Sequence, residues 1–409
     1  MGLLKVLFLL LLLLFPFAEV GRVEFGNGVA FTINDIAVFF LVFGWVLIAL
    51  INRDLLQRLS KSLLKPLAFF LFVCLLSLVF NLNNLSQHEL FVAFLYLVRF
   101  TLYGGIYFVV VGFEKEFKQK IPLFMAISGI SILGIGYIQY LLYPSLRNLY
   151  YLGWDEHLYR MFSSFLDPNF AGIFFALLFF FLTYMTVKNL KDKKRKKTLF
   201  FLVLLTSTTV GIFLTYSRSA LLMFLSGTFT FLLFVKKKMW IFLFLLGLCA
   251  LLIVSPRAFQ TEGTNIFRKA SGESRIESMQ KAVFIFSRNP ILGVGFNAYR
   301  YAQYRYGFLK EVNEQISHAG AGTDNSFLFI LATTGIVGFV SFFFLWKQII
   351  ISAYHNLKDA KSTELQKTIS LVLISSTVGL FVASFFINSL FYPFNLEWMW
   401  ILVGLMEKT

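Results

Sequence analysis

Twelve runs of apolar residues, each close to the length of a membrane-spanning helix, occupy most of this 409-residue chain. A bilayer core needs about 20 apolar residues per helix, and fewer where flanking residues reach the headgroups. Hydrophobic residues make up 58% of the chain and charged residues 14%, a balance that no soluble domain of this size needs. We therefore expect an all-α polytopic membrane protein, with one integral-membrane domain over residues 1–409. The predicted spans are 3–18, 30–51, 66–80, 90–112, 121–143, 169–187, 198–216, 219–235, 239–255, 326–346, 368–387 and 391–406.

The basic residues sort by type onto two sides of the predicted membrane. With the N-terminus inside, 23 of the 37 Lys and Arg residues lie inside, and 20 of those 23 are Lys. The other 14 lie outside or in the outer half of a span, and 11 of those are Arg. Excess positive charge in cytoplasmic loops orients membrane proteins, so both termini are predicted to be cytoplasmic. The inner lysines lie between apolar runs, where anionic membrane lipids are better partners than nucleic acid.

Two outer segments are long enough to carry chemistry. Residues 144–168 contain Arg160, and residues 256–325 form one long external, periplasmic loop between the ninth and tenth spans, with Arg275 and Arg288. Arg presents a planar fork of donors that binds phosphate oxygens in pairs. The Arg-rich outer face therefore predicts a phosphorylated, membrane-tethered substrate, with these three arginines as candidate binding residues.

Two further arginines lie at or inside apolar runs. Arg218 lies in the short outer hairpin TYSRSALL at 215–222. It is a candidate ligand-binding residue, or an arginine that reaches the lipid headgroups. Arg99 lies several residues inside an apolar run, where a charge is costly unless it is paired or hydrated. Because Glu397 lies at similar depth, Arg99 is predicted either to pair with Glu397 or to form a charged, substrate-binding wall of a lipid-headgroup cavity.

Four local motifs occur in order on the predicted outer side: SFLDPNFAG at 164–172, YSRS at 216–219, SRIESMQKAVFIFSRNPILGVGFNAY at 274–299 and DNSFLFILATTGIVG at 324–338. With twelve spans and one long external loop, they make the chain similar to the O-antigen ligase and polymerase superfamily. These are bacterial membrane glycosyltransferases that use undecaprenyl-pyrophosphate-linked glycans. The resemblance implies a multi-pass inner-membrane protein whose active site faces outward. It also implies glycan transfer to an acceptor, either lipid A-core or a growing polysaccharide.

The resemblance further implies a base that activates the acceptor hydroxyl, and the chain departs from the family there. The family has His before Asn at the start of the tenth span, whereas this chain has Asp324 before Asn325. A carboxylate accepts a proton, but its unperturbed pKa of about 4 makes it a weaker base unless burial raises that pKa. His318, on a Gly-rich tether, is the alternative base. Asn325 is a candidate substrate-binding residue and a candidate helix cap.

The predicted chemistry uses arginine in place of metal. The outer face is rich in Arg and poor in closely spaced acidic pairs, so neither a metal site nor a cofactor is predicted. Arg218 and Arg275 are expected to form a clamp that stabilises the pyrophosphate leaving group electrostatically. The resemblance implies direct attack with inversion at the anomeric carbon.

Other functions remain open at this point. A lipid-linked glycan transporter or flippase fits twelve spans, although the chain has no internal duplication and its ionisable residues within spans lie toward the outer edge. An accessory scaffold without activity fits if Asp324 cannot act as a base. Within the superfamily, ligases, polymerases and protein-glycosylating relatives are not separated by these motifs.

Overall fold

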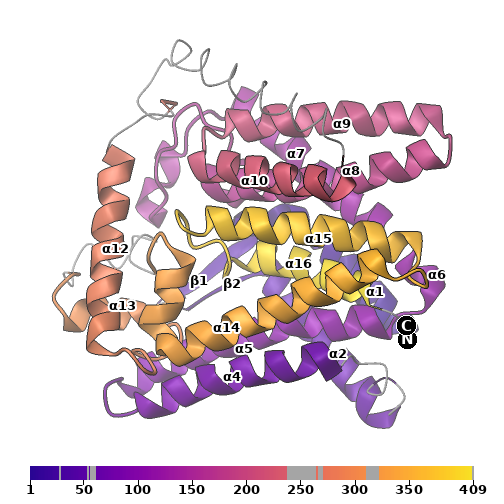
Figure 1. Cartoon of the computed structure of the whole chain (residues 1–409). Helices are drawn as coiled ribbons and strands as arrows, with labels where there is room; N and C mark the ends of the chain where they lie inside the picture. The colour runs from indigo at the N-terminus through magenta and orange to yellow at the C-terminus, as the bar shows by residue number, and fades with distance from the viewer. Residues whose placement is uncertain are drawn as a thin grey trace.

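The computed structural model describes residues 1–26, 29–52, 55, 61–236, 264–265, 270–309 and 322–407. Ten helical segments of this described part are long and apolar enough to cross a membrane, which confirms the all-α polytopic class (Figure 1). Their helices are α1 (Gly2–Leu14), α2 (Ile33–Ile51), α4 (Lys61–Phe80), α5 (Gln87–Gly112), α7 (Ile121–Leu142), α8 (Pro168–Lys191), α9 (Arg195–Leu214), α10 (Arg218–Val235), α14 (Ser326–Lys358) and α15 (Glu364–Ala383). The shorter elements are the helices α6 (Lys115–Lys118), α12 (Ala270–Arg288), α13 (Tyr299–Arg305) and α16 (Pro393–Met406), and the 3-10 turns η1 (Phe15–Gly21), η2 (Arg147–Leu152) and η3 (Ser163–Phe165).

Ten of the twelve predicted spans therefore coincide with long apolar helices, and the other two differ. The predicted span 239–255 lies outside the described residues. The predicted span 391–406 is α16, a helix of 14 residues that is about 21 Å long at 1.5 Å per residue. It is shorter than a bilayer core of about 30 Å, and the residues from Phe394 to Met406 are all buried within the protein.

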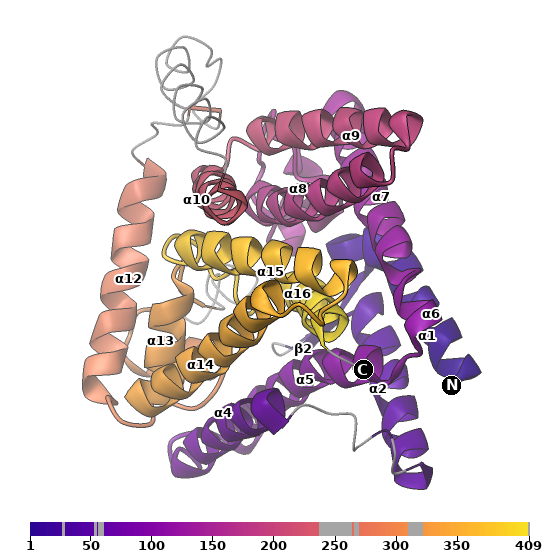
Figure 2. The same ribbon diagram turned by 45° about the vertical axis from the view of Figure 1, so that its right-hand side comes forward.

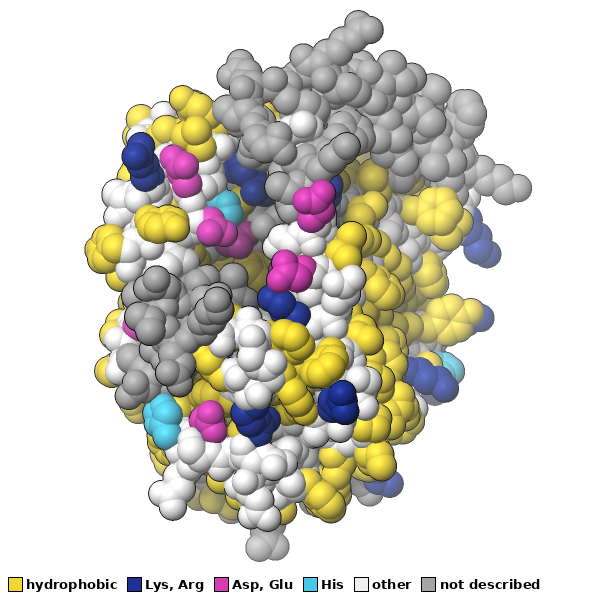
Figure 3. Space-filling model, turned by 90° about the vertical axis from the view of Figure 1, so that its left-hand side faces the viewer, with side chains coloured by type: hydrophobic (Ala, Val, Ile, Leu, Met, Phe, Trp, Pro, Cys, Tyr) yellow, Lys and Arg dark blue, Asp and Glu magenta, His cyan; other side chains and the backbone are white. Residues whose placement is uncertain are grey.

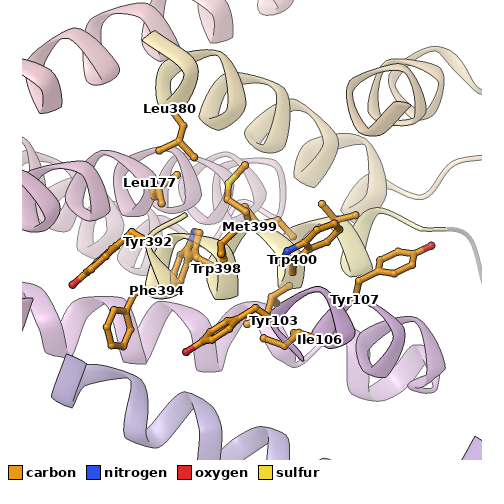
Figure 4. Packing of buried hydrophobic residues seen from close by; sticks show 14 of the residues in the cluster. Tyr103, Ile106, Tyr107, Leu177, Leu380, Tyr392, Phe394, Trp398, Met399 and Trp400 are labelled. Carbon is orange, nitrogen blue, oxygen red and sulfur yellow. The ribbon is translucent and has the colours of Figure 1, made fainter. Parts of the chain in front are cut away.

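Helix α16 forms the centre of the bundle. Its side chains Trp398 and Trp400 pack among Tyr103 and Tyr107 of α5 and Leu177 of α8 (Figure 4). Figure 2 shows the same helix enclosed by α5, α14 and α15. A helix that is apolar on every side can be buried in protein as well as in lipid, so span-like hydropathy is compatible with this short interior helix.

A two-stranded hairpin, absent from the sequence-based prediction, precedes α2. Strand β1 (Arg22–Gly26) pairs antiparallel with β2 (Val29–Thr32). The predicted span 30–51 therefore starts too early, because residues 30–32 are strand and Thr32 caps α2. The Thr32 side chain accepts from the Asp35 N–H, and the Asp35 carboxylate accepts from the Thr32 N–H, a reciprocal cap that satisfies two orphan donors of the helix.

The described part of the predicted external loop lies at one end of the bundle. Helix α12 runs crosswise over the ends of the long helices, next to α13, and the N- and C-termini lie at the opposite end (Figures 1 and 2). This arrangement agrees with a loop on the side of the membrane opposite the termini. Which end faces the cytoplasm remains a prediction from the lysine-rich loops.

The turn that follows α12 is inserted into a break in α14. At the break, Gly335 has φ 65° and ψ −168°, which interrupts the hydrogen bonding within the helix. Four backbone hydrogen bonds join the turn to the break: Val294 N–H to Ala332 O (3.0 Å), Gly295 N–H to Thr333 O (3.0 Å), Ile336 N–H to Pro290 O (2.9 Å) and Val337 N–H to Ile291 O (3.3 Å). The turn thus pairs backbone groups that the broken helix would leave unsatisfied.

Helix α4 fixes the same turn from its other side. The Ser77 hydroxyl donates to Leu292 O (2.6 Å), and the Asn81 amide donates to Gly293 O (3.0 Å). The Gly-x-Gly of the turn (293–295) and the Gly-x-x-Gly of α14 (335–338) belong to two separate sequence motifs. In the structure they form the two sides of one joint, which anchors the C-terminal end of α12.

Candidate functional site

A cavity of about 1430 Å³ opens at the end of the bundle that carries α12 and α13. Its wall combines the hairpin β1–β2, the first half of α5, the loop 153–170, the start of α12, α13 and the segments 322–324 and 387–396. Acidic, basic and histidine side chains surround the hollow on this face of the molecule (Figure 3). Arg99, Arg160, Arg275 and Asp324 all line the cavity, so it collects four of the eight predicted site residues.

Helix α12 brings Arg275 to Asp324. The N–H of Asp324 donates to the Ser278 hydroxyl (3.3 Å), which itself donates to the Thr323 hydroxyl (3.1 Å). Because Arg275 lies three residues before Ser278, it lies on the same face of α12. No hydrogen bond or ion pair joins the Arg275 and Asp324 side chains in the described structure, which leaves both groups able to contact a ligand between them.

Arg160 joins the YSRS hairpin to the Pro-Asn motif. It is only 5% exposed, and its Nε donates to Thr215 O (2.9 Å). Its Nη2 donates to Asn169 Oδ1 (3.4 Å), which also accepts from the Ser217 hydroxyl (3.1 Å). Two motifs that are 48 residues apart in the sequence are therefore held in one polar network, and Arg218 is the first residue of α10 directly after it.

The charges of four groups are coupled at this end of the cavity. Burial lowers the pKa of Arg275 below its usual value; nearby Arg218 lowers it further, while Asp324 and Asp167 oppose this change. Burial also raises the pKa of Asp324; Arg275 counteracts that rise and Asp167 adds to it. The charges of Arg218, Arg275, Asp167 and Asp324 therefore act on one another here, and the carboxyl group of Asp324 holds its proton more tightly than usual.

Arg99 does not pair with Glu397. Its Nε and Nη2 donate to the two oxygens of Asp35 (2.6 and 2.8 Å), and the Tyr103 hydroxyl donates to the same carboxylate (3.0 Å). Glu397 instead accepts from the Asn34 amide (3.1 Å). The predicted Arg99–Glu397 pair is therefore wrong, because Asp35, one turn into α2, supplies a bidentate partner at that depth.

Arg218, Arg288 and Asn325 are not among the residues that line the cavity. Arg288 lies at the far end of α12, over the ring of Phe284 (5.3 Å). Asn325 caps α14: its Oδ1 accepts from Phe327 N–H (2.9 Å) and Leu328 N–H (3.0 Å). This confirms the predicted cap and orients the adjacent Asp324. His318 lies outside the described residues.

Several wall residues were missed in the sequence. Glu19 and Arg22 line the cavity and form an ion pair of 3.4 Å at the start of the hairpin. The sequence does contain a pattern typical of a hairpin, in which Val23, Phe25, Val29 and Phe31 alternate around Asn27-Gly28. The prediction instead assigned residues from 30 onward to a membrane span. Ser278, which positions Asp324, gave no signal because one serine on an exposed helix has no distinctive pattern.

The charged residues of the cavity include several arginines, whereas a metal-dependent enzyme would hold a cluster of metal-ligating side chains. Among the residues that the structure describes, no group of three His, Cys, Asp or Glu side chains is close enough to hold a metal ion. Metal independence remains a prediction, because an activity measurement decides it.

Comparison with known proteins supports the same assignment. Residues 198–343 match the family model for the O-antigen ligase, and this segment contains Arg218, Arg275, Asp324 and Asn325. No curated protein matches the chain. The match confirms the resemblance to the O-antigen ligase and polymerase superfamily. It supports a bacterial membrane protein with a ligase- or polymerase-type function, whose substrates are in general a lipid-linked glycan and an acceptor polysaccharide.

Proposed function

We propose that the protein transfers a glycan from an undecaprenyl-pyrophosphate carrier to a hydroxyl group of an acceptor sugar. The acceptor is lipid A-core for a ligase or the growing chain for a polymerase. The cavity would face outward from the bacterial inner membrane, with both termini in the cytoplasm. The observation that carries the proposal is that Arg275 and Asp324 both line one end of a large cavity, where the charge of Arg218 also acts on Arg275.

In the proposed step, the acceptor oxygen attacks the anomeric carbon of the donor glycan. The new C–O bond forms as the bond between that carbon and the pyrophosphate oxygen breaks, and the bonding electrons leave with the pyrophosphate. The proton of the acceptor hydroxyl passes to the carboxylate of Asp324. Attack opposite the leaving group inverts the anomeric carbon, and Arg218 and Arg275 stabilise the charge that develops on the pyrophosphate without a metal ion.

The surroundings of Asp324 suit a general base. A base works best when its pKa approaches the working pH, and burial together with Asp167 raises the pKa of Asp324 above its ordinary value. The nearby Arg275 opposes that rise and so favours the ionised carboxylate, which is the form that accepts a proton. A transporter site would instead be expected near the bilayer midplane between two matching halves, whereas this cavity lies at one end of the bundle.

The test is transfer by the purified protein in liposomes. The donor is the undecaprenyl-pyrophosphate glycan of the host, and the acceptors are lipid A-core and the donor glycan itself. We expect a longer glycan and free undecaprenyl pyrophosphate in equal amounts, with no loss of rate in the presence of a chelator. The acceptor that is extended separates a ligase from a polymerase.

Matched variants tie this activity to the site. Arg275→Ala should abolish product formation, whereas Arg147→Ala removes an exposed outer arginine and should not. Movement of the intact lipid-linked glycan across the bilayer without bond cleavage would contradict the proposal and favour a flippase.

A further inference from the structure

The cavity is larger than one small-molecule ligand requires. Ligand pockets for small molecules usually enclose about 300–1,000 Å³, whereas this cavity encloses about 1430 Å³. The groups already described occupy only one part of it, which we call the donor end: Arg160, Asp167, Asn169, Arg275 and Asp324. The opposite part, which we call the hairpin end, is bounded by β1–β2, the first half of α5 and α13.

The hairpin end has a different charge balance from the donor end. Arg22 is paired with Glu19 (3.4 Å) and Glu24 (3.0 Å), and Arg99 is held by both oxygens of Asp35. These two arginines are therefore already neutralised by carboxylates within the protein. No ion pair holds Arg275 in the described structure, so the donor end is better able to bind a phosphate group than these two paired arginines are. The hairpin end suits an uncharged ligand with many hydroxyl groups.

Polar and aromatic groups of α5 and α13 face each other across the hairpin end. Arg300, Tyr301 and Tyr304 of α13 line the cavity, as do Glu89 and Tyr96 of α5, and the charges of Arg300 and Glu89 both act on Tyr301. The buried hydroxyl of Tyr304 has no hydrogen-bond partner among the described residues. A buried polar group without a partner is costly, and a ligand hydroxyl would satisfy it.

We propose that the hairpin end is the binding site for the acceptor sugar. Flat tyrosine rings would pack against the C–H face of a sugar ring, and Tyr304, Arg300 and Glu89 would hydrogen-bond its hydroxyl groups. This assignment rests on the proposed transferase function and orders the two substrates along the cavity. The pyrophosphate lies at the donor end and the acceptor sugar lies at the hairpin end, with its reacting hydroxyl directed to Asp324 of the donor end.

Two variants test the assignment in the full-length protein in liposomes. Tyr304→Phe removes the hydroxyl without breaking an internal hydrogen bond of the described structure. It should raise the KM for the acceptor about threefold to tenfold, as expected for one neutral hydrogen bond, with the donor KM unchanged. Arg300→Gln should raise the acceptor KM at least as much. Both variants should keep the wild-type thermal stabilisation by inorganic pyrophosphate, which probes the donor end.

Tyr150→Phe is the matched control, because Tyr150 is 72% exposed in η2 and lies outside the cavity wall. Unchanged acceptor KM in both test variants, or an equal rise in donor KM, would overturn the assignment.

A failure of the proposed function gives a different result. If the wild type forms no product, binding of the oligosaccharide released from the host carrier by mild acid tests the site alone, by saturation-transfer NMR. Weaker binding to Tyr304→Phe than to Tyr150→Phe would support a sugar site, and equal binding would refute it.

Discussion

The joint between α12 and α14 is the feature that we expect to be most sensitive to a single methyl group. Gly335 has φ 65° and ψ −168°, a backbone region that is essentially restricted to glycine and costs other residues about 1–3 kcal/mol. A Cβ added there would also lie closer than 3.0 Å to the backbone of Ile291 and Leu292. Gly335→Ala must therefore push the inserted turn out of the helix break.

The expected cost follows from the four hydrogen bonds that hold the turn. At a net value of about 0.5–1.5 kcal/mol each, their loss adds about 2–6 kcal/mol to the backbone strain. The sum, about 3–9 kcal/mol, is comparable with the whole stability of a typical domain, about 5–15 kcal/mol. Since the turn anchors α12, Arg275 should leave Asp324 and transfer should stop.

The assay is thermal unfolding in detergent alongside transfer in liposomes, with two glycine controls. Gly307 also has a positive φ of 74°, but a Cβ there meets nothing within 4 Å, so Gly307→Ala should show only a modest loss from backbone strain. Gly134 lies within α7 with open space around it, so Gly134→Ala should be neutral or slightly stabilising. Gly293→Ala, which meets the Thr333 backbone from the opposite side, should reproduce the effect of Gly335→Ala. Wild-type unfolding temperature and activity in Gly335→Ala would refute the inserted joint.

Four further predictions concern the site and the topology. Arg218→Lys keeps the charge but loses the planar fork, so transfer should fall at least tenfold at unchanged protein levels; full activity would make Arg218 a headgroup anchor. Asp324→Asn should abolish transfer with little change in unfolding temperature, because the cap of α14 belongs to Asn325; if Asp324→Asn is active and His318→Ala is inactive, the base is His318. Transfer should be lost as the pH falls through the raised pKa of Asp324. Because Arg275 lowers that pKa, the residual activity of Arg275→Gln should be lost at a higher pH than that of the wild type. A pH profile that Arg275→Gln leaves unchanged would exclude Asp324 as the titrating base. A reporter fused after Lys197 should be cytoplasmic and one inserted at Thr264 external, and the reverse result would invert the proposed topology.

The helices were predictable because hydropathy of span length is a strong signal, and ten long helices lie where the sequence indicated. The hairpin β1–β2 was not predicted, because its alternating apolar residues run directly into the apolar residues of the span that follows. The sequence did not show that α16 is short and buried among other helices, because periodicity cannot tell a helix surrounded by lipid from one surrounded by protein. Its burial is visible only in the structure, where α5, α14 and α15 enclose it.

The sequence indicated several residues of the site, but it could not indicate which of them contact one another. Arg-rich motifs on one predicted side pointed to Arg160, Arg218 and Arg275, because the choice of Arg over Lys outside the membrane has a chemical reason. Nothing in the sequence could show that Arg99 would pair with Asp35 and not with Glu397, because a buried ion pair depends on distances of a few ångströms between helices. The same holds for Ser278, whose role arises only where α12 meets the 323–324 segment.

The replacement of the expected histidine by Asp324 can be understood through its neighbours. A histidine has an unperturbed pKa of about 6.5, close to a working pH near neutrality, whereas an aspartate starts at about 3.9. Burial and the Asp167 charge move the pKa of Asp324 upward, in the direction of the residue that the family uses. The nearby charge of Arg275 opposes that rise. Asp167 also caps α8, accepting from Asn169 N–H at 2.6 Å, so the charge that adjusts the proposed base is held in place by the Pro-Asn motif. We therefore expect a substitution of Asp167, in the SFLDPNFAG motif, to change the pH dependence of transfer that Asp324 sets.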